Sequence, residues 1–93
     1  KYLTAWVSAN MPTVHRFRGF NVVIYPSDHT PAHVHVIGKG GMAVFKLHCP
    51  DGPPELRETA GLTRKEVVSI ANALNDVLCT LCAKWGEVHH GRY

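Results

Sequence analysis

The chain of 93 residues lacks several features that would assign it to a broad class at once. No apolar run approaches the roughly 20 residues that a membrane-spanning helix needs, so we expect no bilayer crossing and no membrane partner. Three cysteines are too few, and odd in number, for a disulfide-stapled secreted scaffold, which favours a reducing cytoplasm. A net charge of +3 is too mild to mark a nucleic-acid-binding protein by itself.

The composition that remains is that of an ordinary globular protein. Hydrophobic residues make up 45% of the chain and charged residues 18%, which excludes a disordered chain. This length supports a single hydrophobic core and leaves no room for a second domain. We therefore expect one domain over residues 11–93, preceded by an N-terminal extension of residues 1–10.

Two β-hairpins are predicted in the first half of the domain. Residues 13–18 and 20–25 are rich in β-branched and aromatic side chains and flank a tight turn at Arg18-Gly19. Residues 32–37 and 42–48 flank a glycine-rich connection, which predicts the second hairpin.

The second hairpin has a well-defined register. Symmetric closure sets Ile37 opposite Met42 and His33 opposite Lys46. One face then carries only small or apolar side chains: Ala32, Val34, Val36, Ala43, Phe45 and Leu47. The opposite face carries His33, His35, Lys46 and His48, and a one-residue slip would mix the two sets.

A long helix is predicted after the strands. Residues 49–61 contain too many prolines and glycines for a regular element, and we interpret them as a crossover loop. Thr63 and Glu66 have the spacing of a capping box, and apolar residues then recur every three or four positions as far as Val88. The predicted fold class is α+β, with a four-stranded antiparallel meander and one helix from Arg64 to about Val88 packed on its apolar face.

The predicted helix is longer than the sheet that it covers. At 1.5 Å per residue, a six-residue strand leaves about a third of the apolar stripe uncovered, so something else must cover the rest. A homodimer through the helix is one candidate. On this helix Cys82 is assigned to the core and Cys79 to the surface, and His89 and His90 beyond it are assigned to a solvated tail.

Residues 25–36 concentrate the candidate chemistry of the chain. His33 and His35 project from the same face of one strand about 7 Å apart, a spacing that suits one metal ion or one phosphate. With His29 and Asp28 from the preceding loop they predict a site for a divalent transition metal. The alternatives are exposed histidines without a ligand and an aspartate that only fixes the loop through backbone hydrogen bonds.

The same face also permits chemistry without a metal. His33 and His35 would act as acid and base, with Lys46 and Arg16 holding a phosphate. Tyr25 and Arg16 would form a small stacking-and-charge pair for single-stranded nucleic acid. The candidate ligand or partner face therefore comprises Arg16, Tyr25, Asp28, His29, His33, His35 and Lys46.

Several segments point together to one family: Met11-Pro12-Thr13, Phe17-Arg18-Gly19, the run Tyr25-Pro26-Ser27-Asp28-His29-Thr30-Pro31-Ala32-His33-Val34-His35-Val36, and Ala43-Val44-Phe45. From Met11 to Val88 the chain resembles small bacterial proteins grouped as a domain of unknown function, DUF4160. The resemblance implies strands followed by a helix and a bacterial cytoplasmic setting. It points at Asp28, His29, His33 and His35 without giving them roles.

Two function hypotheses follow. Members of this family are often encoded beside a second small protein. The resemblance therefore implies a binding or regulatory module that is one half of a toxin–antitoxin-like pair. Its expected partner is a small protein or RNA, and DNA is a further alternative. The alternative is an enzyme: a nuclease or metal-dependent hydrolase centred on the histidines.

Overall fold

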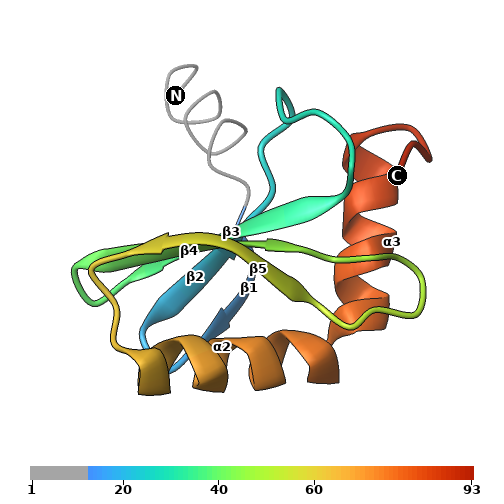
Figure 1. Cartoon of the computed structure of the whole chain (residues 1–93). Coiled ribbons are helices and arrows are strands. Elements are labelled where there is room, and N and C mark those ends of the chain that lie inside the picture. The colour runs from blue at the N-terminus through green and yellow to red at the C-terminus, as the bar shows by residue number, and fades with distance from the viewer. Residues whose placement is uncertain (1–12) are drawn as a thin grey trace.

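The computed structural model, which describes residues 13–93, shows an antiparallel sheet followed by two helices (Figure 1). The elements are β1 (Thr13–Phe17), β2 (Phe20–Val23), β3 (His33–Gly38), β4 (Gly41–Lys46), β5 (Glu55–Ala60), α2 (Arg64–Asp76) and α3 (Leu78–Val88). The strands form a meander in which each pairs with its neighbour in sequence. The α+β class and the antiparallel sheet are confirmed, and the predicted extension lies outside the described residues.

The predicted register of the second hairpin is confirmed residue by residue. Ile37 pairs with Met42 and His33 with Lys46, as symmetric closure requires. All of the small and apolar side chains assigned to one face are buried: Ala32, Val34, Val36, Ala43, Phe45 and Leu47. In the first hairpin Phe17 pairs with Phe20. The alternation of side chains therefore places the core face of the sheet correctly.

The prediction of four strands is wrong, because β5 occupies the second half of the segment interpreted as a loop. The breakers Pro50, Gly52, Pro53 and Pro54 all precede Glu55, so nothing after them prevents pairing with β4. Every residue of β5 is exposed, so the strand has no buried face and shows no apolar alternation. It is an edge strand of polar composition, which sequence periodicity does not reveal.

The prediction of one long helix is also wrong. Val77 has φ −117° and ψ 20°, outside helical values, and α2 and α3 are bent by 77° at this residue. Both helices bury apolar side chains, so the apolar pattern continues through the break and conceals it. The predicted capping box of Thr63 and Glu66 does begin α2.

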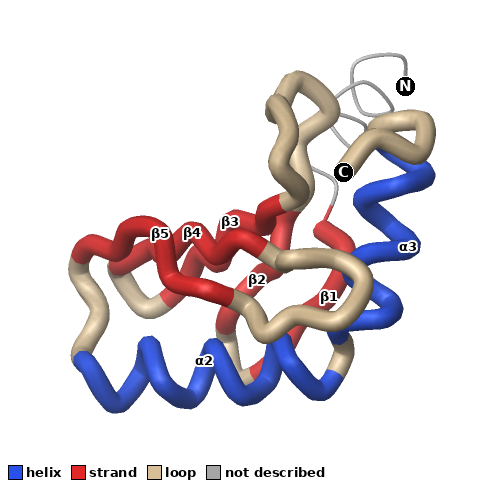
Figure 2. Tube along the Cα trace, turned by 45° about the vertical axis from the view of Figure 1, so that its right-hand side comes forward, coloured by secondary structure: helices blue, strands red, loops and turns tan. Residues whose placement is uncertain are grey.

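The bend resolves the mismatch between helix and sheet. α2 has 13 residues and spans about 20 Å, the length of a six-residue strand. It runs along one face of the sheet, whereas α3 rises past the sheet's end (Figures 1 and 2). No excess stripe then needs a second copy of the chain, and the homodimer stays a prediction. Within the described residues no single helix is long and apolar enough to cross a membrane, and α2 and α3 reach that length and hydropathy only together, across their bend.

The core lies between the sheet and the two helices. Ile70 and Leu74 of α2 and Leu81 and Trp85 of α3 are fully buried against the sheet. Cys82 is buried as predicted, but it forms a disulfide with Cys49, which sequence analysis did not pair. The 33 residues between the two cysteines give no local signal of the bond. Cys79 is exposed and unpaired, as predicted.

Candidate metal centre

The loop between β2 and β3 presents Asp28 to the sheet. The Asp28 backbone N–H donates to the Tyr25 carbonyl at 3.0 Å. In return, the Tyr25 backbone N–H donates to Oδ2 of Asp28 at 3.3 Å. This is the loop-fixing role weighed for an aspartate at this position. It leaves the carboxylate 17% exposed and turned toward β3. The structural role and a ligand role therefore coexist in Asp28.

His33 and His35 on β3 complete a compact group with this carboxylate. Nε2 of His33 lies 3.4 Å and Nε2 of His35 lies 3.2 Å from the same Oδ2 of Asp28. One ligand atom from each of the three residues lies within 4.8 Å of the other two. The i, i+2 spacing on one strand brings the two imidazoles to the same face, as predicted.

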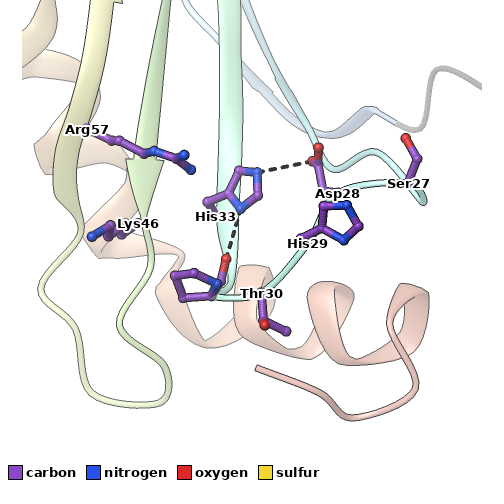
Figure 3. Close-up of a pocket in the computed structure, with 8 residues that line it drawn as sticks. Ser27, Asp28, His29, Thr30, His33, Lys46 and Arg57 are labelled. Carbon is purple, nitrogen blue, oxygen red and sulfur yellow. Dashed lines mark hydrogen bonds and ion pairs between the residues drawn. The ribbon is translucent and has the colours of Figure 1, made fainter.

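Hydrogen bonds among the described residues engage Nδ1 of His33 but leave Nε2 of His35 without a partner. Nδ1 of His33 lies 2.9 Å from the Pro31 carbonyl, which can only accept, so Nδ1 carries the proton. In the neutral ring Nε2 then presents a lone pair to the Asp28 carboxylate (Figure 3). Nε2 of His35 is buried and makes no hydrogen bond with the described residues. Two imidazole nitrogens and one carboxylate oxygen, all possible metal ligands, are thus brought together.

The spacing of these atoms fits a metal ion. A tetrahedral ion with bonds of about 2.0–2.1 Å holds its ligand atoms about 3.3 Å apart. The two nitrogen–oxygen separations of 3.2 and 3.4 Å match that value. The bond from His33 to the Pro31 carbonyl is the outer contact that metal-ligating histidines commonly make through their second nitrogen.

The prediction that His33 faces solvent is wrong. His33 is 6% exposed, and its ring centroid lies 5.3 Å from that of Trp85. The reason is the bend between α2 and α3, which carries Trp85 past the end of the sheet where β3 begins. His35 is less covered, with its side chain 23% exposed and its ring edge-on to Tyr25 at 4.9 Å.

The prediction of a solvated tail at His89 is wrong as well. Nε2 of His89 donates to the Asp28 carbonyl at 3.0 Å, and its ring stacks on Trp85 with centroids 3.7 Å apart. The tail is also held by a hydrogen bond from the Ala32 N–H to the Tyr93 carbonyl. The loop that bears Asp28 is therefore anchored to the end of α3, whereas His90 is exposed.

Four residues of the predicted face do not join this group. His29 lines a neighbouring cavity but brings no ring nitrogen into the cluster of ligand atoms. Arg16 is exposed on β1, and its Nε donates to Asn21 at 3.1 Å. Tyr25 contributes its ring to His35 and its backbone to Asp28. Lys46 lines the same cavity as His29.

That cavity, of about 400 Å³, adjoins two of the three candidate ligands, Asp28 and His33. Its lining comprises Ser27, Asp28, His29, Thr30, Pro31, His33, Lys46 and Arg57. In Figure 3 the guanidinium of Arg57 extends from β5 toward His33. Sequence analysis missed Arg57 because its strand was interpreted as a loop. The register of β4 and β5 shifts beside it, since Phe45 pairs with Leu56 but Val44 with Glu58.

The family model for Domain of unknown function (DUF4160) matches residues 19–86. The chain belongs to this family. No curated protein and no solved structure matched the chain significantly. The match covers β2 to α3 and therefore includes Asp28, His33 and His35, but its description assigns no activity to this DUF4160 domain.

One acidic residue of the DUF4160 domain lies beside the cavity without lining it. Glu55 pairs in register with Lys46, and its Oε1 lies 2.6 Å from Nε2 of His48. The hydrogen bond and charge of His48 lower the pKa of the Glu55 carboxyl, and Lys46 adds to the effect. The exposed Glu55 carboxylate therefore interacts mainly with His48 and only weakly with Lys46. The Lys46 ammonium is left to interact with a group bound in the cavity.

Proposed function

We propose that this domain binds one divalent transition-metal ion through Asp28, His33 and His35. The observation that carries the proposal is that two imidazole Nε2 atoms lie 3.4 and 3.2 Å from the same carboxylate oxygen, with one ligand atom from each residue within 4.8 Å of the other two. Nitrogen and oxygen ligands of this kind suit zinc, nickel, copper and iron(II). Magnesium and calcium are disfavoured, because they prefer oxygen ligands.

A proton is the competing occupant of the group. A proton on Nε2 of His33 would turn its contact with Asp28 into an ion pair, but it would leave Nε2 of His35 buried and unbonded. Leaving a buried polar atom unsatisfied costs about 1–3 kcal/mol. A metal ion accounts for all three atoms at once, and we therefore favour it.

Titration with zinc tests the proposal, using protein without a polyhistidine tag. We expect one zinc ion to bind per chain. Asp28→Asn or His35→Ala should lower the zinc affinity more than about 100-fold, because each removes a direct ligand. Loss of a group that only holds a ligand in place already costs about 10–100-fold. His29→Ala is the matched control, because it removes an imidazole from the same loop but not from the group. Equal affinity in Asp28→Asn and the unmodified protein would refute the site.

The enzymatic role that this geometry favours is metal-dependent hydrolysis. Three protein ligands leave a coordination position open, as in catalytic rather than structural zinc sites. An ion with an open position activates water and polarises a substrate oxygen. The test is release of nitrophenol from chromogenic phosphate esters by the zinc-loaded protein, with Asp28→Asn as the inactive comparison.

The regulatory role stays a separate proposal. A small partner protein or RNA would contact the same surface, and the positive side chains of Lys46 and Arg57 support a negatively charged partner there. Co-expression with a candidate small partner protein, followed by co-purification of the unmodified protein and of Lys46→Ala, tests this role. Loss of the complex in Lys46→Ala would support it, and equal recovery of both would count against this surface.

A further inference from the structure

We infer that the cavity beside the metal centre binds the phosphate group of a phosphomonoester, placed between the ion and the side chains of Lys46 and Arg57. This inference rests on the proposed metal site. It adds a ligand class, and it assigns a role to Arg57, which lies outside the three metal ligands.

The charges that line the cavity favour an anion. Lys46 and Arg57 are the lysine and the arginine that line it, and Asp28 is the single acid in its lining. A divalent ion bound to Asp28 would outweigh the negative charge of the carboxylate. The ion and both cationic side chains would then attract a negative group. Glu55 is the acid that competes for Lys46, and it is bound to His48. Lys46 is therefore available, and Arg57 is the stronger of the two anchors because a guanidinium can bind two phosphate oxygens at once.

The positions of the side chains favour a phosphate in particular. Arg57 reaches from β5 toward His33, one of the proposed metal ligands, and both residues line the cavity (Figure 3). A guanidinium matches two phosphate oxygens at once, and a lysine ammonium adds a point charge. Ser27 and Thr30 also line the cavity. An ion held by the proposed ligands would supply a further positive charge for the phosphate.

The size and charge of the cavity favour a monoester over a diester. About 400 Å³ lies in the lower part of the range of small-molecule pockets. A phosphomonoester carries close to two negative charges at neutral pH, whereas a diester carries one. Three neighbouring positive centres attract the dianion more strongly. The chemical class that we assign is therefore a small molecule, or a chain end, with a terminal phosphate.

Phosphorus NMR of the cobalt(II)-loaded protein tests this inference, with phenyl phosphate as the probe. Cobalt(II) takes the same ligands as zinc and is paramagnetic, so a phosphate beside it has a broadened resonance. We expect the phosphorus resonance of phenyl phosphate to broaden in a saturable way. Arg57→Ala should lower the affinity for phenyl phosphate at least about tenfold, and Lys46→Ala should lower it less, because each removes charge-assisted hydrogen bonds. Cobalt affinity should be unchanged in both variants. Arg16→Ala and Lys84→Ala are the matched controls, since both remove exposed cations outside the cavity.

The outcomes separate this inference from the metal site itself. Cobalt binding without phosphate broadening, or broadening that Arg57→Ala leaves unchanged, would overturn the inference and leave the metal site standing. Failure to bind cobalt would overturn both. Dimethyl phosphate is the diester probe, and tighter binding of dimethyl phosphate than of phenyl phosphate would refute the assignment to monoesters.

Discussion

Nε2 of His33 faces Oδ2 of Asp28 at 3.4 Å, while Nδ1 of the same ring donates to the carbonyl of Pro31. Both nitrogens of the ring are thus oriented by groups on the loop between β2 and β3. The ring is also packed against Trp85, which fixes its plane. The ligand nitrogen is therefore held in place by the fold before an ion arrives, and such preorganisation favours binding.

His33 contributes to stability, and His35 contributes less. We expect His33→Ala to lower the free energy of unfolding by about 2 kcal/mol, because it removes a buried ring and leaves the Pro31 carbonyl unpaired. His35→Ala should cost less than about 1 kcal/mol, because it also removes an unsatisfied buried nitrogen. Urea unfolding in the presence of a chelator measures both. A larger loss for His35→Ala would contradict the packing described above.

His89 positions the loop that bears Asp28 and is not itself one of the proposed metal ligands. We expect His89→Ala to weaken zinc binding by roughly 10-fold, because the loop that bears Asp28 loses its hydrogen bond to the end of α3. The adjacent His90→Ala is the matched control and should bind zinc normally, since His90 is exposed. Restoring affinity with His89→Gln, which can still donate to the Asp28 carbonyl, would separate this positioning role from loss of the fold. Equal affinities in His89→Ala and His90→Ala would refute it.

The disulfide between Cys49 and Cys82 ties the end of β4 to α3. Closing a loop of 33 residues stabilises a fold by about 3.7 kcal/mol. We expect reductant, or the double change Cys49→Ala with Cys82→Ala, to lower the free energy of unfolding by about that amount. Cys79→Ala should have little effect, because this thiol is exposed and unpaired. Thiol titration should find only Cys79 reactive in the oxidised protein, and three reactive thiols there would contradict the bond.

The N-terminus of α2 makes stability depend on pH. The Thr63 N–H donates to Glu66 at 2.8 Å, and this bond lowers the pKa of the Glu66 carboxyl below 4.5 in the folded state. The stabilisation is complete above the unfolded pKa, about 4.5, and is lost as the pH falls through the lower folded pKa. Glu66→Gln does not titrate, so its stability deficit relative to the unmodified protein should shrink below pH 4.5. A deficit that stays constant from pH 6 to pH 3 would contradict this cap.

The sequence predicts the elements whose side chains alternate or repeat between core and solvent. The pairing of β3 with β4 follows from the separation of Val34 and Val36 from His33 and His35. β5 has no buried face, so its sequence lacks the alternation of apolar and polar residues from which strands are predicted. The break at Val77 is missed for the opposite reason, since apolar residues continue on both sides of it.

The candidate site is predictable to the extent that it is local. Asp28, His33 and His35 lie within eight positions of one another, and the strand geometry alone brings the two imidazoles together. Arg57, Trp85 and His89 reach the site through β5 and the bend before α3, and neither feature has a sequence signal here. The contact of His89 with Asp28 joins residues 61 positions apart. Contacts at that separation depend on tertiary packing that the local pattern does not encode.

Nitrogen-15 NMR of the histidine rings, recorded before and after the addition of one equivalent of zinc, tests the metal site most directly. We predict that Nε2 of His33 and of His35 shift to the values of metal-bound nitrogen, while Nδ1 of His33 keeps its proton for the Pro31 carbonyl. The rings of His15, His29, His48 and His90 should not change. Coordination through Nδ1 of His33, or ion-dependent shifts confined to these other histidines, would contradict a centre built from Asp28, His33 and His35.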